Sequence, residues 1–492
     1  MNKKNLVIGL AHGVFDIVHI GHIEHFKEAK QSCDKLIVSV TADKFVNKGP
    51  NRPAFTLSDR IKFLKSITYI DEVIVSNYET AIKSIQNVKP DIYFKGLDYD
   101  NINKRSKNNL NKEIQEIKKF GGKFLITRSK LKSSSKILNE NFNYVNKNVR
   151  SFLKRINKKE FLEKLIKTLF NNDKKQYKML LVGEQILDFY TKVTLQGKSQ
   201  KSGVITAMKT KTQKYGGGSI LVANLLCHFL NKLNFLVDGN TDTVKMLRKY
   251  FVKPRNINFI TSGKKVNKIL IKERYIDAYS KARLFQVNQN QKFFDTNNEN
   301  KKFQNILLKK TKKFKNIIIF DFGYGYIDEN FSNILKNKSN NFYINCQTNS
   351  SNYGFNLFSK YKKAEILCVD EAEFRLTFRN RTSSIPEIIS KNQIILNQYK
   401  TFIVTSGASG CYVLHKKKIE FIPTVFETTL DTTGCGDTFF STFIYFYLQK
   451  KFTLKEISLL AHIAAGLHGL SEGNKIVLNK NNFFQNVQSI IK

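Results

Sequence analysis

Two short segments of this 492-residue chain hold side chains whose types and spacing suit chemistry on phosphate groups. In residues 13–22 (GVFDIVHIGH), His19 and His22 stand three positions apart, between an apolar run typical of a strand and a pattern typical of a helix. Side chains three apart share one face of a helix, and a helix N-terminus offers unpaired N–H groups and a positive dipole to phosphate. The spacing therefore predicts that both histidines donate hydrogen bonds to phosphate oxygens.

The second segment, residues 430–440 (LDTTGCGDTFF), has a glycine-rich turn, then a carboxylate, then an apolar helical run. Gly434, Cys435 and Gly436 would present backbone N–H groups at a helix N-terminus, which forms an anion hole for a transferring phosphoryl group. Asp437 would then lie where it can take a proton from an attacking hydroxyl. We expect Cys435 to act through its backbone alone, as a small residue in the turn.

Alternating strand and helix patterns must position both segments. In residues 4–140, short apolar runs such as 35–40 (KLIVSV) and 123–127 alternate with helical patterns, which predicts a parallel sheet with helices on both faces. Ligands bind at the carboxyl edge of such a sheet, where the first segment would fall. Residues 141–176 are polar and lysine-rich around an amphipathic stretch at 160–170, which predicts a helical linker.

A second α/β stretch follows, with strands predicted at 177–182, 235–237, 316–320, 342–345, 366–369 and 401–404. Period-2 patterning between residues 190 and 214 predicts a small antiparallel lid. We thus expect a protein of class α/β in three parts: a parallel-sheet domain at 1–140, the linker at 141–176, and an α/β domain with a small β lid at 177–492.

The composition argues against several classes of protein. Lys and Arg number 82 against 40 Asp and Glu, a net charge of +42, but the lysines are scattered rather than gathered into a tail or stripe, which argues against nucleic-acid binding. The excess does favour anionic small substrates. No segment reaches the ~18 apolar residues of a membrane helix, and the six cysteines show no C-x-x-C spacing, which argues against a zinc ribbon or disulfide scaffold. We expect a cytoplasmic protein that does not bind membranes.

Residues 13–22 resemble the signature of the cytidylyltransferase-like nucleotidyltransferases, and the resemblance continues through residues 5–140. Residues 48–53 (KGPNRP) resemble the family's basic segment that contacts triphosphate, residues 91–99 (DIYFKGLDY) its P-D-x-x-x-K-G-x-D-Y segment, and Arg128 with 133–137 (SSSKI) its R…S-T-T-x-I signature. The resemblance implies a Rossmann-like fold and a nucleotide site made of Gly13, Phe15, Asp16, Gly21, Arg52, Lys95, Asp98, Arg128, Ser133, Ser134 and Ser135.

By the same resemblance, this domain transfers a nucleotidyl group from ATP or CTP to a phosphorylated alcohol and releases pyrophosphate. His19 and His22 would stabilise charge on the α-phosphate and the leaving group, and Lys48 or Lys44 would hold the triphosphate. Positioning and charge neutralisation suffice for this chemistry, with Mg²⁺ as cofactor and no covalent nucleophile. His12 would either line the pocket or pack at the end of the strand.

Residues 430–440 resemble the corresponding turn of the ribokinase (PfkB-type) sugar kinases, and the resemblance extends over residues 177–480. It implies ATP and Mg²⁺ as cofactors, with Asp437 as the base and the anion hole at 434–436. The implied sugar ligands are Asp188, Gly217, Gly218 and Asp321, the implied nucleotide turn is Thr405, Gly407 and Gly410, and the residue implied to organise Mg²⁺ is Glu373.

Three positions depart from the kinase pattern. Leu221 stands where the family's sugar-binding Asn is expected, Asp370 replaces the first residue of N-x-x-E, and the strand around Asn345 lacks the usual D-P. The anion hole and the base are intact, so the resemblance implies kinase activity and leaves the identity of the sugar open.

Together the two domains resemble the bifunctional heptose-phosphate kinases and heptose-1-phosphate adenylyltransferases of lipopolysaccharide precursor synthesis, here in reversed order. This implies that one domain makes a sugar 1-phosphate, which the other couples to a nucleotide, as in an ADP-heptose precursor. The nearest alternative is a CTP-dependent polyol-phosphate cytidylyltransferase with a non-catalytic, sugar-binding kinase-like domain. Ribokinase-like enzymes often pair through their lids, and strands at 190–214 would permit such a homodimer.

Overall fold

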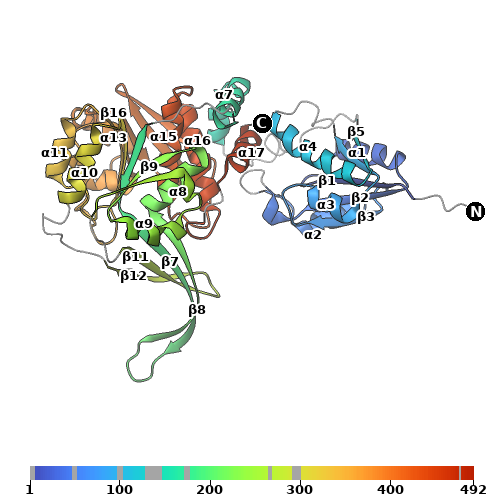
Figure 1. Ribbon diagram of the computed structural model, residues 1–492, viewed down its shortest axis with the longest axis horizontal. Coiled ribbons are helices and arrows are strands. Elements are labelled where there is room, and N and C mark those ends of the chain that lie inside the picture. Colours follow the sequence, from blue (N-terminus) through green and yellow to red (C-terminus); the bar gives the residue numbers. More distant parts are fainter. Residues whose placement is uncertain are drawn as a thin grey trace, which may run out of the picture. The chain divides into compact units, whose positions relative to one another are not determined.

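The computed structural model describes residues 6–46, 52–96, 104–127, 147–170, 178–263, 269–290, 301–475 and 478–491. The chain divides into two compact units, Met1–Lys147 with Gln485–Lys492, and Asn148–Phe484, both drawn in Figure 1. No described helix is long and apolar enough to cross a membrane. The six cysteines are all free thiols.

The first unit is built on a five-stranded, fully parallel sheet in the order β3-β2-β1-β4-β5. Its strands are β1 (Ile8–Gly13), β2 (Lys35–Thr41), β3 (Glu72–Ser76), β4 (Ile92–Gly96) and β5 (Lys123–Thr127). Its helices are α1 (Ile20–Gln31), α2 (Leu57–Lys65), α3 (Ile82–Val88) and α4 (Lys104–Lys119). The predicted alternation and the Rossmann-like parallel sheet are confirmed.

Both faces of this sheet are buried, which explains the nearly continuous apolar runs of its strands. On one face, Val38 of β2 packs in a core with Phe26 of α1 and Leu64 of α2. On the other face, Ile37 of the same strand packs in a core with Ile117 of α4. Burying each such side chain contributes about 1.5–3 kcal/mol, so the strands that carry the site are held from both sides.

The second unit contains a nine-stranded sheet in the order β10-β9-β6-β13-β14-β15-β16-β17-β18. Neighbours from β10 to β16 are parallel, and β17 and β18 are antiparallel at one edge. The strands are β6 (Met179–Gly183), β9 (Leu233–Val237), β10 (Ile257–Thr261), β13 (Asn316–Asp321), β14 (Asn341–Cys346), β15 (Ala364–Asp370), β16 (Tyr399–Thr405), β17 (Gly410–His415) and β18 (Lys418–Pro423). The strands predicted here occur, with small shifts at their ends.

Helices cover both faces of the nine-stranded sheet. On one face, α15 (Cys435–Gln449) packs against α8 (Ser219–Phe229) and α16 (Leu454–Gly469). On the other, apolar side chains of α10 (Lys301–Thr311), α11 (Glu329–Lys336), α12 (Glu371–Phe378) and α13 (Ile385–Lys391) share one core with the strands. Other helices are α9 (Thr241–Leu247), α14 (Gln393–Leu396) and α17 (Lys480–Ile491), the last of which begins in the second unit. Because α15 is enclosed by neighbours, its sequence is apolar nearly all round.

A four-stranded sheet in the order β12-β11-β7-β8 forms the lid of the second unit. The predicted antiparallel pair is present as β7 (Gln185–Lys198) and β8 (Ile205–Gly218), whose hairpin projects from the body in Figure 1. The sheet is mixed, however, because β11 (Leu270–Asp277) runs parallel to β7 and antiparallel to β12 (Arg283–Gln289). These two strands come from a distant part of the chain, so local patterning at 190–214 did not indicate them.

The predicted linker contains α6 (Lys147–Leu153) and α7 (Lys158–Phe170). Helix α7 packs on the second unit, where the Phe161 ring lies 6.1 Å from that of Phe452 and Lys164 Nζ lies 3.7 Å from Glu456 Oε1. The predicted helical character is therefore present in the described residues.

Candidate active sites

The histidine segment of the first unit lies where its strand order reverses. The chain builds β1, β2 and β3 outward on one side and then β4 and β5 on the other, so the crevice between the carboxyl ends of β1 and β4 is a topological switch point. Gly13 ends β1 and Gly96 ends β4. The loop that follows Gly13 leads directly into α1, which places the motif at this crevice.

The two motif histidines lie together at the start of α1. His19 is the N-cap residue, its ring centroid lies 4.0 Å from that of His22, and its backbone N–H donates to His22 Nδ1 at 3.4 Å. Phe15, at φ +49°, packs edge-on against His22 at 5.5 Å, while Gly21 is buried in α1. The predicted side-by-side placement of the two rings at the helix N-terminus is what the structure shows.

Asp16 and Arg52 form a buried ion pair beside the histidines. Arg52 Nη1 lies 3.0 Å from Asp16 Oδ2, and Asp16 Oδ1 accepts hydrogen bonds from the backbone N–H groups of Ala54 at 2.6 Å and Phe55 at 3.1 Å. Within the described residues, the Asp16 carboxylate thus anchors the segment that follows Arg52. Arg60 also connects α2 to the motif, since its Nη1 donates to the Val14 carbonyl at 2.5 Å.

Lys95 lies close to His12 and adds to the effect of burial on the charge of His12 and His25. Its Nζ lies 3.4 Å from the carbonyl of His12 and 3.8 Å from Glu113 Oε2. Burial, with the Lys95 charge as the second cause, lowers the pKa of His12 to about 3 and that of His25 to about 4. Both rings are therefore neutral near pH 7. They hydrogen-bond hydroxyls, His12 Nδ1 that of Ser39 at 3.1 Å and His25 Nδ1 that of Thr127 at 2.6 Å.

Several residues assigned to the nucleotide from sequence lie outside the described part of the chain. They are Lys48, Asp98, Arg128, Ser133, Ser134 and Ser135. Their assignments stay predictions.

The aspartate motif of the second unit opens α15. Gly434 is the N-cap at φ +76°, and a Cβ on it would lie 2.6 Å from Leu221 Cδ2, so both its backbone angle and its surroundings require glycine. A Cβ on Gly436 would meet nothing within 4 Å, which leaves open space beside the turn. Cys435 points its Sγ at the carbonyl of Ala465, and burial raises the pKa of this thiol to about 12. Only its backbone is thus offered to a ligand.

Asp437, the predicted base, is a buried carboxyl group with a raised pKa. Burial, with the Asp188 charge adding, raises its pKa to about 6. Gln347 Nε2 donates to Asp437 Oδ1 at 2.5 Å and works against that rise. A carboxyl group with a pKa near 6 is ionised at pH 7 yet basic enough to accept a proton from a hydroxyl.

Asp188 is held near this base by two residues that sequence reasoning missed. Arg274 Nη1, on β11 of the lid, lies 2.6 Å from its Oδ1, and Asn474 Nδ2 lies 2.5 Å from its Oδ2. A Cβ on Gly217 would lie 2.0 Å from Asp188 Oδ2, so the glycine allows the carboxylate to rest on the β8 backbone; Gly218 follows as the N-cap of α8. The structure thus brings Asp188 and Gly217 together as predicted.

A second carboxylate ties the lid to the turn. Arg283 of β12 pairs with Asp431, whose Oδ1 also accepts from the Thr433 N–H at 2.8 Å and whose Oδ2 accepts from the Gly473 N–H at 3.0 Å. These hydrogen bonds lower the pKa of Asp431, although burial opposes them. Asp431 therefore fixes the residues that flank the anion hole.

Asp321, predicted as a sugar ligand, has a carboxylate that binds other residues of the protein. It is almost fully buried, and its carboxylate binds Lys360 Nζ at 2.6 Å, the Tyr361 hydroxyl at 2.8 Å and the Gly323 N–H at 3.0 Å. Neighbouring Glu184 accepts from the Phe322 and Tyr324 N–H groups, each at 3.0 Å. The carboxylate of Asp321 thus organises the loop after β13, and its assignment as a sugar ligand stays a prediction.

Glu373 lies in the first turn of α12. Its Oε1 accepts from the Thr348 N–H and its Oε2 from the Asp370 N–H, both at 2.7 Å. Burial, followed by the charges of Asp370 and Asp437, raises the pKa of Glu373 to about 8. Thr405 ends β16, and Gly407 and Gly410, both at positive φ, form the turn that follows it.

The carboxylates around Glu373 decide how this site could hold Mg²⁺. Among the described residues, no group of three or more His, Cys, Asp or Glu side chains could hold a metal ion. Protein sites for Mg²⁺ commonly use one or two carboxylates, with waters and substrate phosphates completing the shell. Glu373, crowded by other carboxylates, fits that limited role.

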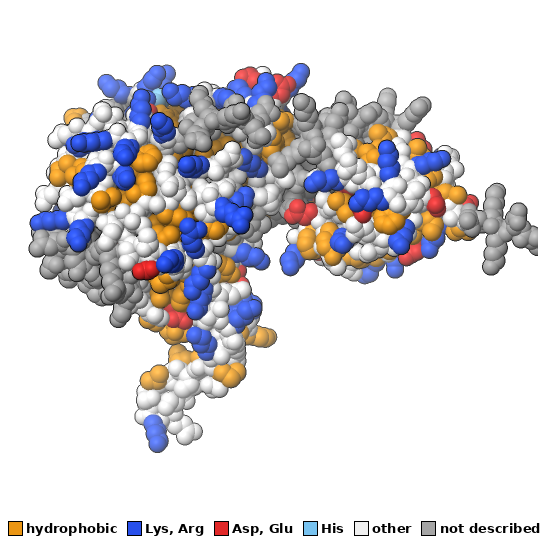
Figure 2. Space-filling model, in the orientation of Figure 1, with side chains coloured by type: hydrophobic (Ala, Val, Ile, Leu, Met, Phe, Trp, Pro, Cys, Tyr) orange, Lys and Arg blue, Asp and Glu red, His pale blue; other side chains and the backbone are white. Residues whose placement is uncertain are grey.

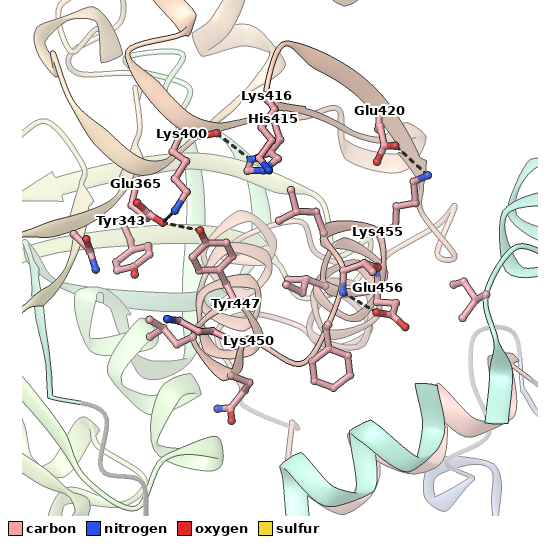
Figure 3. Close-up of a pocket in the computed structure, with 18 of the residues that line it drawn as sticks. Tyr343, Glu365, Lys400, His415, Lys416, Glu420, Tyr447, Lys450, Lys455 and Glu456 are labelled. Carbon is pink, nitrogen blue, oxygen red and sulfur yellow. Dashed lines mark hydrogen bonds and ion pairs between the residues drawn. The ribbon is translucent and has the colours of Figure 1, made fainter. Parts of the chain in front are cut away.

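A large pocket of this unit lies away from the aspartate motif. It has a volume of about 1300 Å³ and is lined by Asn316, Asn341, Glu365 and Lys400, which lie at the amino ends of β13 to β16. Figure 3 shows Lys400 and Tyr447 both meeting Glu365 in it. Because the aspartate motif and Glu373 lie beyond the carboxyl ends of the parallel strands, this pocket is not the predicted kinase site.

The basic side chains on one face of the surface are scattered. On the face drawn in Figure 2, Lys and Arg side chains are dispersed over both units and form no continuous stripe.

Comparison with known proteins assigns both units. Residues 10–140 match the Cytidylyltransferase-like family and residues 327–478 the pfkB family of carbohydrate kinases. The chain joins a cytidylyltransferase-like domain to a PfkB-type carbohydrate kinase domain. Both domain types imply transferase activity, and kinases of the second type use ATP.

Curated relatives match about a fifth of this chain. The "Bifunctional protein HldE" of Paramagnetospirillum magneticum is 36% identical over 99 residues, 20% of this chain and 20% of that protein. The protein of the same name from Campylobacter fetus is 40% identical over 101 residues, 20% of this chain and 22% of that protein. The matched part thus spans about a fifth of each relative.

Solved structures resemble the second domain. Phosphofructokinase-2 from Escherichia coli, in complex with potassium, is 12% identical and covers 64% of this chain and 98% of its own, with a TM-score of 0.48. The ribokinase of Giardia lamblia is 15% identical, covers 62% and 97%, and has a TM-score of 0.47.

Proposed function

We propose that this chain is a bifunctional enzyme of nucleotide-sugar synthesis. Residues 1–140 would be the nucleotidyltransferase, residues 177–492 the sugar kinase, and residues 141–176 the connection. The observation that carries the proposal is that Asp188 lies close to the turn before Asp437. Asn474 Nδ2 donates to Asp188 Oδ2 at 2.5 Å, and Asn474 Oδ1 would lie 2.9 Å from a Cβ on Gly434.

In the kinase, Asp188 binds a substrate hydroxyl and Asp437 accepts the proton of the hydroxyl that attacks ATP. The N–H groups of residues 434–436 stabilise the charge of the transferring phosphoryl group. Mg²⁺, bound mainly by the nucleotide, would neutralise phosphate charge, with Glu373 beside it. Arg283 of β12 attaches the lid to Asp431, and Asp188 of β7 attaches it to Asn474, so lid position and site geometry are linked.

In the transferase, His19 and His22 bind the phosphates at the start of α1. Buried Lys95 contributes positive charge, and the neutral rings of His12 and His25 add none. Asp16 pairs with Arg52 and anchors residues 54 and 55, and Lys48 is the proposed triphosphate ligand. With the attacking oxygen already part of a phosphate, this reaction needs no proton acceptor.

The substrate pair that we favour is ATP with a heptose 1-phosphate for the transferase and a heptose phosphate for the kinase, toward a precursor of lipopolysaccharide in the cytoplasm. The relatives named HldE support this choice for the first domain. The nucleotide remains to be decided between ATP and CTP by experiment.

The test is to supply the full chain with ATP and CTP in turn, each with a panel of sugar 1-phosphates and polyol phosphates, and to measure pyrophosphate. ADP release with heptose and hexose phosphates is measured separately. ATP with heptose 1-phosphate as the best pair supports the proposal. CTP with a polyol phosphate and no sugar-dependent ADP would replace it with a cytidylyltransferase carrying an inactive kinase-like domain.

A further inference from the structure

Asn474 carries a polar atom that the protein itself does not satisfy. The residue is 4% exposed and follows α16. Its Nδ2 donates to Asp188, but its Oδ1 is buried with no hydrogen-bond partner in the part of the chain that the structure describes. Buried side-chain oxygens nearly always have a partner. The position of this one therefore calls for an explanation.

The unpaired oxygen lies at the anion hole. A Cβ placed on Gly434 would lie 2.9 Å from Asn474 Oδ1 and 2.6 Å from Leu221 Cδ2. The amide thus connects the carboxylate of Asp188 with the turn that precedes Asp437. Its oxygen, from the turn after α16, and the end of the Leu221 side chain, from α8, approach the same point.

The backbone that carries Asn474 is firmly placed. Gly473, at φ +68°, donates its N–H to Asp431 Oδ2 at 3.0 Å, and a Cβ on it would touch the rings of Tyr190 and Tyr215 at 3.2 Å. The amide is also oriented, because Asp188 can accept only from the NH₂ end. The oxygen must consequently face away from Asp188.

We propose that Asn474 is a substrate-binding residue of the kinase site, whose Oδ1 accepts a hydrogen bond from a substrate hydroxyl next to the one bound by Asp188. This inference rests on the proposed kinase function and names a substrate class, since two adjacent acceptors suit a substrate with neighbouring hydroxyls, as in a sugar or polyol. Its Nδ2 keeps Asp188 oriented. Asn474 supplies an amide at the point where Leu221 offers only methyl groups.

The first test uses the full chain, ATP, and heptose 7-phosphate, together with a panel of hexose phosphates and polyols. Asn474→Ala should raise the KM for the hydroxyl substrate about tenfold, the size of one lost hydrogen bond, and leave the KM for ATP within about twofold. Asn474→Ser retains a hydroxyl and gives a second variant if the alanine protein is poorly folded. Asn340→Ala is the control, because that buried amide donates to the carbonyls of Thr311 and Phe314 outside the site; it should change only Tm.

The second test removes the amide at position 474 and places one at position 221. Because Leu221 and Asn474 reach the same point beside Gly434, Leu221→Asn in the Asn474→Ala background should recover part of the lost affinity for the hydroxyl substrate. A purely structural asparagine predicts no such recovery.

The outcomes separate the inference from the function on which it rests. If the wild-type chain releases no sugar-dependent ADP with any member of the panel, the proposed kinase and this inference both fall. If the wild type is active and Asn474→Ala keeps its KM for the hydroxyl substrate, only the inference falls. It also falls if neither variant at position 474 folds while Asn340→Ala does, because Asn474 would then be structural.

Discussion

The two candidate sites have opposite electrostatics. In the first unit, Asp16 is neutralised by Arg52, and Lys95 lies buried beside neutral His12 and His25. In the second, Asp437 and Glu373 have raised pKa values. A phosphate oxygen that attacks an NTP has no proton to lose, whereas a sugar hydroxyl does. The second site, with its raised carboxyl pKa values, can therefore supply the base that a hydroxyl substrate needs.

The largest expected effect comes from removing the proposed base of the kinase site. Asp437→Asn should lower the kcat of sugar-dependent ADP release by about 10²–10⁴-fold, since it removes the proton acceptor, and leave pyrophosphate release unchanged. Steady-state rates of both reactions on one preparation give the comparison. Unchanged ADP release would mean that Asp437 is not the base.

The converse change addresses the first site. His22→Ala should slow pyrophosphate release by about 10²–10³-fold, the range found when one preorganised donor to a developing charge is removed, while ADP release stays at the wild-type rate. His25→Ala is the matched control on the same helix, because His25 bonds Thr127 inside the protein. Equal losses from the two variants would argue against a special role for His22.

The pH dependence should differ between the sites. Because burial raises the pKa of Asp437 to about 6, kinase kcat/KM should fall about tenfold per unit below pH 6. Any further rise between pH 6 and 8 would report Glu373, whose pKa burial raises to about 8. Rates from pH 5 to 8 in both assays check this. A kinase profile without an ascending limb near pH 6 would contradict the assignment.

The smallest effect concerns the lid. Leu195, Val204, Ile205 and Met208 of the hairpin region and Phe285 of β12 are exposed apolar residues, and we expect them to pair two copies of the chain. Val204→Lys with Ile205→Lys should lower the mass seen by light scattering from dimer to monomer, with little change in Tm. A wild-type protein that is monomeric at all concentrations tested would overturn the dimer.

Local signals in the sequence predicted the parts of the sites that are contiguous. The strand ends and the glycine turns at residues 13–22 and 430–440 follow from periodicity and turn chemistry, and both motifs lie where expected. Arg274, Asn474 and Gln347 could not be found this way. They reach Asp188 or Asp437 from 86, 286 and 90 residues away and belong to no local pattern.

Asp321 has contacts that local reasoning did not indicate. It follows a strand at the carboxyl edge, as a ligand would, and its carboxylate binds Lys360 and Tyr361. Only the packing of the loop after β14 decides this, and no spacing near Asp321 reports it.

The central claim is that one chain runs two transfers at two chemically distinct sites. The most direct measurement is of ADP and pyrophosphate release by the wild type, Asp437→Asn and His22→Ala, with heptose 7-phosphate and heptose 1-phosphate as the respective acceptors. We predict that Asp437→Asn loses only ADP release and His22→Ala loses only pyrophosphate release. Loss of both activities in either folded variant, or of neither, would contradict the account.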